Sequence, residues 1–274
     1  MQDEYRQAAG VAHVLPGPAV APGTQGAAID WWLRFLIDPA PSVGLAAAGL
    51  RSGRAPCLRA GAELLGELGA IDHHTRQLAS VEPARFAHRD DEWWARVSYA
   101  LALLAELYRA PRVDGSRLMR LNPDDGAAQL LALANADEVA DLVAMRDLAV
   151  KRLLPALPPG QVVSGPTFEG SADLNADADL IVGGLLMDFK ASQGGRPRSD
   201  GTRAAALSRA DLDQLLGYVL LDYSDGFRLD AVAIYAVRFG HFQTWPLREL
   251  CTRMAGHPVD LALLRKQFAV LLRR

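Results

Sequence analysis

Apolar positions recur every three or four residues through the first half of the chain, which is the spacing of helices with a buried face. The pattern predicts helices at residues 27–37, 59–68, 91–108 and 127–154. The first should end where Asp38 meets Pro39, because a proline disfavours helical backbone in the residue before it. Residues 1–22 are rich in Gly, Pro and Ala, and we expect a loosely ordered arm there. The first half therefore indicates an all-α bundle.

The pattern changes after the proline-rich stretch at residues 155–160. Short apolar runs predict strands at 161–163, 167–168, 179–182, 185–191 and 229–239, and helical spacing returns at 211–223. Residues 192–208, rich in Arg and Gly, are expected to form a mobile loop. The order β-β-β-α-β indicates an α+β class, so we expect a helical region at 1–156 and a mixed sheet flanked by helices at 157–274.

Gly183 and Gly184 separate two of these apolar runs and predict a two-residue hairpin turn with positive φ. Counting outward from that turn, Leu180 faces Met187 and Asp179 faces Asp188. Residues two apart on a strand share a face, so Lys190 lies on the same face as Asp188. One end of the hairpin thus gathers two carboxylates and an ammonium.

Like charges directly opposite each other destabilise a sheet, so something must offset the repulsion between Asp179 and Asp188. A hard divalent cation does so, because Mg²⁺ takes one or two carboxylates and keeps waters for a substrate phosphate. The alternative is a solvated surface ion cluster of no catalytic significance.

Composition limits the function classes. Half of the residues are apolar and the formal net charge is −3. The chain therefore lacks the overall positive charge that is typical of nucleic-acid-binding proteins. The basic residues are almost all arginine; the three lysines are Lys151, Lys190 and Lys266. A compact ammonium at Lys190, where the chain otherwise prefers arginine, favours a specific role there.

Cys57 and Cys251 stand far apart without a metal-site spacing, which fits a reducing compartment. We expect no signal peptide, no membrane span and a cytoplasmic protein. His73, His74 and His88 lack Asp or Cys at ligand spacing, so we do not expect them to bind metal.

Asp179 followed by Asp188-Phe189-Lys190 resembles the signature of the PD-(D/E)XK nuclease superfamily, with Ala178 in place of the usual proline. The following helix adds Gln214 and Tyr218, which are similar to the Q-x-x-x-Y element of the RecB-type branch. The resemblance covers about residues 162–239 and implies a restriction-endonuclease-like fold, preceded here by the helical region.

The resemblance implies Mg²⁺- or Mn²⁺-dependent hydrolysis of DNA phosphodiester bonds, in bacterial defence against phage, restriction or DNA repair. Asp179 and Asp188 would bind the metal, Lys190 would position the attacking water, and Gln214 and Tyr218 would hold the site and the strand. Two further ligands are kept open: Asp173, in Gly170-Ser171-Ala172-Asp173, as an alternative first ligand, and Glu138 from an upstream helix.

A second hypothesis is a catalytically silent nucleic-acid-binding or assembly subunit with the same fold. Single- and double-stranded DNA both stay open as partners, as do a protein partner through the helical region and a homodimer.

Overall fold

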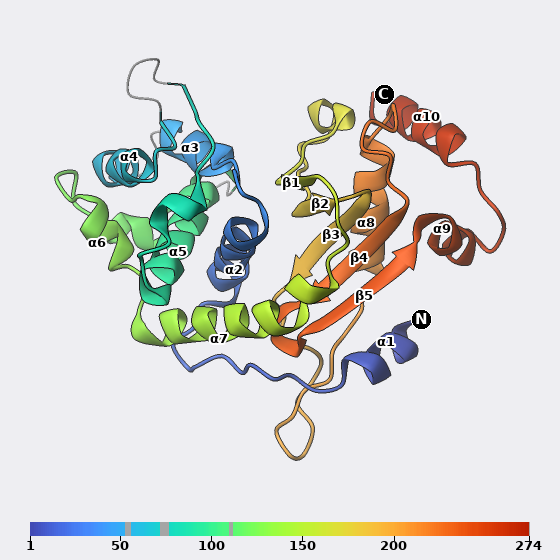
Figure 1. Ribbon diagram of the computed structural model, residues 1–274, viewed down its shortest axis with the longest axis horizontal. Helices are drawn as coiled ribbons and strands as arrows, with labels where there is room; N and C mark the ends of the chain where they lie inside the picture. The colour runs from blue at the N-terminus through green and yellow to red at the C-terminus, as the bar shows by residue number, and fades with distance from the viewer. Residues whose placement is uncertain (53–55, 72–76, 110–111, 274) are drawn as a thin grey trace. The chain divides into compact units, whose positions relative to one another are not determined.

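The computed structural model describes residues 1–52, 56–71, 77–109 and 112–273; His73 and His74 lie outside them. The chain divides into two compact units (Figure 1). Val14–Asp147 forms the helical unit, and Met1–His13 joins Leu148–Arg274 in the sheet unit. Within the described residues no helix is long and apolar enough to cross a membrane.

The helical unit contains helices at the first three expected places, and the helix at Gly44–Arg51 is an addition. Its elements are α2 (Pro22–Ile37), α3 (Gly44–Arg51), α4 (Leu58–Glu67), α5 (Asp91–Arg109), α6 (Ala127–Leu131) and the first part of α7 (Ala136–Arg152). α5 packs against α2 and α3. Gly49 permits the close approach of α3, since a Cβ there would lie 1.8 Å from the carbonyl oxygen of Leu104.

The single helix expected at 127–154 is wrong; the chain forms α6 and α7 instead. Asn135 starts α7 as its N-cap. Its side-chain oxygen accepts from the Glu138 backbone N–H at 2.9 Å, and the Glu138 carboxylate accepts from the Asn135 N–H at 3.0 Å. This reciprocal capping box fixes the break.

The sheet unit holds one five-stranded mixed sheet, which confirms the α+β class. Its strands, in spatial order, are β1 (Val162–Ser164), β2 (Leu180–Val182), β3 (Leu185–Lys190), β4 (Ala231–Ala236) and β5 (His241–Pro246). All neighbours are antiparallel except β3 and β4, which are parallel and joined through α8 (Arg209–Leu221). The C-terminal helices are α9 (Leu247–Ala255) and α10 (Leu261–Leu272).

The hairpin register is confirmed: Leu180 pairs with Met187 and Val182 with Leu185. Gly183 and Gly184 have φ of 55° and 87°, as the tight turn requires. The strand expected at 167–168 is wrong, since Thr167 forms only an isolated bridge with Asp177. β5 and α9 were not predicted.

α8 covers the sheet face that carries Asp188 and Lys190. Its apolar residues Leu212, Leu215 and Val219 belong to one buried cluster with Ile181 and Leu186 of the hairpin. Val232 and Ile234 of β4 complete that layer. Packing of α8 therefore sets how its polar residues meet the carboxyl end of β3.

The prediction of a loosely ordered arm at residues 1–22 is wrong for the first part of that segment. α1 (Gln2–Ala9) docks on the sheet unit, with Tyr5 only 3% exposed. The Tyr5 ring packs edge-on against His241, with ring centroids 5.0 Å apart. So short a helix depends on tertiary contacts rather than on its own propensity.

Candidate active site

Asp179 and Asp188 lie at the end of the hairpin where the antiparallel pairing stops. The pairing of β2 with β3 ends at Leu180 and Met187. Just beyond it, the Asp179 carboxylate accepts a hydrogen bond from the Phe189 backbone N–H at 2.7 Å. Asp188 is buried, 3% exposed. The structure therefore brings these two carboxylates to one end of the hairpin, as expected.

Lys190 lies at the centre of a group of polar side chains that we call the hairpin cluster: Asp179, Asp188, Lys190, Asp211, Gln214 and Tyr218. Its Nζ lies 2.7 Å from Asp188 Oδ2 and 3.5 Å from Asp211 Oδ1, and it donates to Gln214 Oε1 at 2.7 Å. The side chain is 26% exposed, so the ammonium is neither sealed off nor fully in water. The cation thus joins the end of β3 to the first two turns of α8.

Burial by itself would lower the pKa of Lys190, but the charge and hydrogen bond of Asp188, and then Asp211 and Asp179, raise it overall. The ammonium form is favoured because three carboxylates surround it. Carboxyl groups from three places in the chain thus meet at one ammonium.

Asp211 was not predicted as part of this cluster. It is the third residue of α8 and forms a capping box with Ser208: Ser208 N donates to Asp211 Oδ2 at 2.8 Å, and Asp211 N donates to Ser208 Oγ at 3.1 Å. The Ser-x-x-Asp spacing was a signal for a helix start. Its second carboxylate oxygen faces Lys190, which only the packing of α8 reveals.

Gln214 and Tyr218 lie one helical turn apart on α8, and both join the cluster. Gln214 Nε2 donates to the Tyr218 hydroxyl at 2.7 Å, so the Tyr218 O–H proton remains available to another acceptor. Burial, and further out the charges of Asp188, Asp179 and Asp177, raise the pKa of Tyr218, against a lowering effect of the Gln214 bond. The phenol is therefore protonated at neutral pH.

Asp173 takes part in a different contact. Its carboxylate accepts from the Tyr223 hydroxyl and from Arg273 Nε, both at 2.9 Å. These bonds, Tyr223 first, lower the pKa of Asp173. The structure thus gives Asp173 partners near the end of α8 and in the C-terminal segment, and within the described residues it forms no hydrogen bond or ion pair with Lys190.

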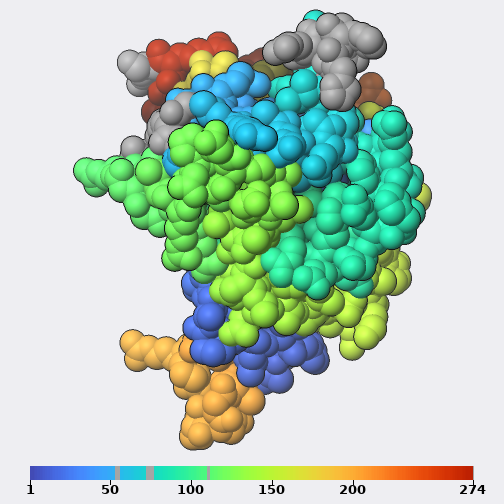
Figure 2. All heavy atoms as spheres, turned by 90° about the vertical axis from the view of Figure 1, so that its left-hand side faces the viewer, coloured from blue at the N-terminus to red at the C-terminus, as the bar shows by residue number. Residues whose placement is uncertain are grey.

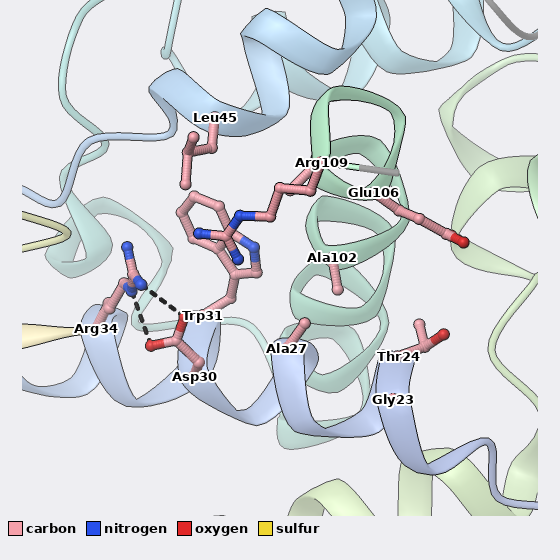
Figure 3. A pocket seen from close by; sticks show the side chains of 11 residues that line it. Gly23, Thr24, Ala27, Asp30, Trp31, Arg34, Leu45, Ala102, Glu106 and Arg109 are labelled. Carbon is pink, nitrogen blue, oxygen red and sulfur yellow. Dashed lines mark hydrogen bonds and ion pairs between the residues drawn. The ribbon is translucent and has the colours of Figure 1, made fainter. Parts of the chain in front are cut away.

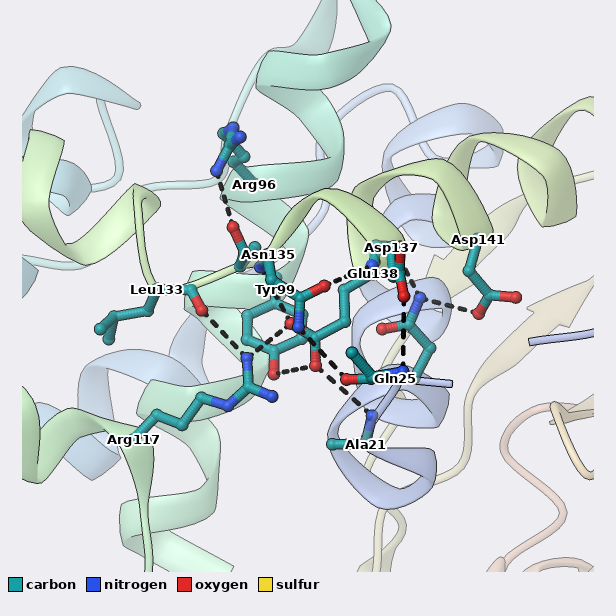
Figure 4. Close-up of polar contacts among 12 residues, drawn as sticks. Ala21, Gln25, Arg96, Tyr99, Arg117, Leu133, Asn135, Asp137, Glu138 and Asp141 are labelled. Carbon is teal, nitrogen blue, oxygen red and sulfur yellow. Dashed lines mark hydrogen bonds and ion pairs between the residues drawn. The ribbon is translucent and has the colours of Figure 1, made fainter. Parts of the chain in front are cut away.

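Glu138 lies in the helical unit, fully buried in a network of its own (Figure 4). Its Oε2 accepts from Arg117 Nη1 at 2.5 Å and from the Asn135 N–H; its Oε1 accepts from the Tyr99 hydroxyl at 2.9 Å and from the Ala21 N–H at 3.4 Å. Four donors, one of them the paired Arg117 guanidinium, match what a buried carboxylate needs. Glu138 therefore has a complete structural role within its unit.

The donor chemistry at the hairpin fits a hard divalent cation. Carboxylate oxygens are the ligands that Mg²⁺ prefers, and this cation is commonly held by one or two carboxylates with water and a substrate phosphate. Among the residues that the structure describes, no group of three or more His, Cys, Asp or Glu side chains is arranged as a ready-made metal cage. Asp179 and Asp188 are the carboxylates of the hairpin that could hold such an ion.

The helical unit also contains a cavity of about 380 Å³ lined by residues of α2, α3 and α5 (Figure 3). Two of its charged residues bind each other: Arg34 donates to both oxygens of Asp30, at 2.8 and 2.6 Å. Glu106, also in the wall, accepts from Ser116 at 3.1 Å. Because these groups already have partners, the hairpin cluster is the stronger candidate for chemistry.

Comparisons with family models, curated proteins and solved structures find no match to this chain.

Proposed function

We propose that the chain is a metal-dependent nuclease of the PD-(D/E)XK type, RecB-like branch, that hydrolyses DNA phosphodiester bonds. The observation that carries the proposal is the contact of Lys190 Nζ with both Asp188 and Gln214, each at 2.7 Å. It links the two sequence elements on which the resemblance depends. The mixed sheet with α8 on the Asp188 face is compatible with a restriction-endonuclease-like core.

In the proposed mechanism Asp179 and Asp188 hold Mg²⁺ or Mn²⁺, which when bound supplies Lewis-acid stabilisation of the phosphate and acidifies water. Lys190 orients the attacking water and stabilises the negative charge that develops on the phosphate oxygens. Gln214 holds the Lys190 ammonium in place through its carbonyl oxygen.

Tyr218 donates its remaining proton in a hydrogen bond to a phosphate oxygen of the substrate strand. Burial, and to a smaller extent the nearby carboxylates, raise the pKa of the Tyr218 phenol. The phenol therefore keeps this proton at neutral pH. Asp211 acts on the site through Lys190, so it is a positioning residue.

The test incubates the full chain with linear and circular, single- and double-stranded DNA in Mg²⁺, Mn²⁺ or EDTA. Asp188→Asn and Lys190→Ala should abolish cleavage while the circular dichroism spectrum stays unchanged. Asp213→Asn and Lys266→Ala are matched controls, because Asp213 is exposed on α8 and Lys266 is exposed on α10; both should cleave normally.

Each other outcome has a distinct meaning. DNA binding without cleavage in either metal would favour the second hypothesis, a silent binding or assembly subunit. Cleavage that survives Lys190→Ala would reject the proposed mechanism. Neither DNA binding nor metal affinity would reject both functions.

A further inference from the structure

The segment between β3 and α8, expected to be an irregular mobile loop, has hydrogen-bonded structure of its own. The Gly195 N–H donates to the Ala204 carbonyl at 2.9 Å, and the Arg198 N–H donates to the Thr202 carbonyl at 2.8 Å. A turn closes its tip, with the Gly201 N–H donating to the Arg198 carbonyl at 3.0 Å. We call residues 192–207 the basic loop. It projects from the sheet unit as a narrow ribbon, orange in Figure 2.

The base of the basic loop is anchored on the side that leads into α8. Arg203 Nη1 donates across the base to the Gly195 carbonyl at 3.0 Å. Ala204 also forms an antiparallel bridge with Val11, from the segment that follows α1. The Ala12 N–H donates to the Arg203 carbonyl at 3.2 Å. The N-terminal segment thus acts as a third strand beside the base.

The side of the basic loop that follows β3 is anchored as well. Arg238, which is 2% exposed, donates from Nε to the Ala191 carbonyl at 2.9 Å. Gly194 has a φ of +85°, and a Cβ there would lie 2.3 Å from the Ala204 carbonyl oxygen. Only glycine fits this close crossing of the two sides. The base is therefore held by contacts on both sides, while the tip extends into solvent.

The tip carries unneutralised positive charge. Arg196 and Arg198 are exposed, and in the described part of the chain neither guanidinium forms a hydrogen bond or an ion pair within 4 Å. Asp200 accepts from Thr202 instead, at 2.7 and 2.9 Å. Those bonds, followed by the nearby charge of Arg198, lower the pKa of Asp200. With three arginines and one aspartate, the basic loop has a net charge of 3 − 1 = +2.

The hairpin cluster has the opposite character, because three carboxylates surround Lys190 there. Such a cluster repels a polyanion unless a metal is bound, so it supplies little of the affinity for a nucleic acid. The phosphate backbone is bound mainly through Arg and Lys charges that release its counterions. The arginines at the tip are placed to do this, since the basic loop begins two residues after Lys190.

We propose that Arg196 and Arg198 at the tip of the basic loop bind backbone phosphates of the DNA to one side of the cleaved bond. The inference rests on the proposed nuclease function and adds the surface that holds its substrate. Arg198 lies eight positions after Lys190, so their backbones are at most about 26 Å apart at ~3.3 Å per residue. At ~3.4 Å per base step, the contacted phosphates lie within about eight nucleotides of the cleaved bond.

The first test measures how binding of a labelled 30-base-pair duplex in Mg²⁺ depends on salt, in a Lys190→Ala background that prevents cleavage. Replacing Arg196 and Arg198 by Ala should reduce the slope of log K against log salt by about 1.8, at ~0.9 per phosphate contact. Arg248→Ala is the matched control. Arg248 is exposed and follows β5, whose last residue Pro246 pairs with Ala231 at the end of the sheet away from Lys190. It should leave the slope unchanged.

The second test uses cleavage by the otherwise unaltered chain. The double variant should raise KM several-fold and leave kcat unchanged, because the arginines bind a part of the strand that does not react. Shortening one flank of the duplex below about eight base pairs should raise the wild-type KM to that of the double variant, at the reach estimated above. The double variant should not respond to that shortening.

The outcomes separate this inference from the proposed function. If the wild type cleaves DNA and the double variant keeps its KM and salt slope, only the role of the basic loop is rejected. If Arg248→Ala has the same effect as the double variant, the binding is nonspecific and the inference is rejected. If the wild type binds through the two arginines but never cleaves, the inference stands and the nuclease function fails. If it neither binds nor cleaves any DNA, both fail.

Discussion

Two buried carboxylates, one in each unit, are held in opposite ways. Glu138 accepts from four donors and is paired with Arg117, so its charge is matched one for one. Asp188 instead lies in a cluster in which the Lys190 ammonium also interacts with Asp211 and Asp179. A carboxylate whose donors are complete stabilises its own fold. A carboxylate that shares a cation with other carboxylates can accept a further cation, which is the role that we propose for Asp188.

The largest expected effect is on the stability of the helical unit. Glu138→Ala leaves the partly buried Arg117 guanidinium without its carboxylate and the buried Tyr99 hydroxyl without its acceptor. Removal of one partner of a buried ion pair costs about 3–5 kcal/mol. Urea unfolding followed by circular dichroism should show this loss. Glu67→Ala, at an exposed position of α4, should stay within about 0.5 kcal/mol. A similar small effect for Glu138→Ala would remove the contrast between the two carboxylates.

The next effect concerns metal. If the hairpin cluster binds Mg²⁺, a metal concentration one hundred times the Kd should raise the free energy of unfolding by about 2.7 kcal/mol. Thermal unfolding with Mg²⁺ and with EDTA measures the shift. The Asp179→Asn/Asp188→Asn double variant should lose it and Glu138→Gln should keep it; the reverse pattern would place the metal in the helical unit.

A smaller effect is expected without metal. Asp188→Asn removes one of several like charges, and Lys190 keeps Asp211 and Asp179 near it. The free energy of unfolding in EDTA should rise or change by less than about 1 kcal/mol. Chemical denaturation of both proteins in EDTA compares them directly. A loss as large as that from Glu138→Ala would mean that Asp188 is equally well satisfied and that the comparison is wrong.

The smallest effect tests how far the field of the cluster extends. His241 pairs with Ala236, which pairs with Lys190, so its strand is the second one from β3. Burial lowers the pKa of His241, which means that the carboxylates do not outweigh burial there. The ordinary pKa of a histidine is about 6.5, and His241 has this pKa only in the unfolded chain. As the pH falls through that value the unfolded chain binds the proton before the folded chain does, so the free energy of unfolding should fall.

Thermal unfolding at about pH 7.5 and about pH 5.5, on either side of that pKa, measures the effect. His241→Gln should reduce the difference in Tm, whereas His88→Gln, at an exposed position, should not. An unchanged or higher Tm of the wild type at the lower pH would indicate that the negative field reaches β5.

The parts of the site that follow from local rules could be predicted. Gly183-Gly184 and the two-residue period of a strand fix the register, and the four-residue period of a helix aligns Gln214 with Tyr218. The link between Lys190 and Gln214 could not, because it depends on how α8 packs on the sheet. Asp211 was missed for the same reason.

The elements that were missed also have a physical cause. α1 is short and is stabilised mainly by the burial of Tyr5, a contact with residues more than 200 positions away. β5, with the sequence HFQTWP, mixes polar and aromatic residues and has no clear apolar alternation. In both cases distant partners, rather than local preference, determine the conformation.

The sheet unit is built from two separate pieces of the chain, with the whole of Val14–Asp147 between them. During synthesis the helical unit emerges as one continuous stretch and can fold early, since domains generally fold as units from the N-terminus. Met1–His13 emerges before the helical unit but cannot dock until β5 has left the ribosome, because Tyr5 packs on His241 and Trp245. A ribosome stalled before residue 241 would therefore carry a folded helical unit together with an α1 segment still without its docking surface.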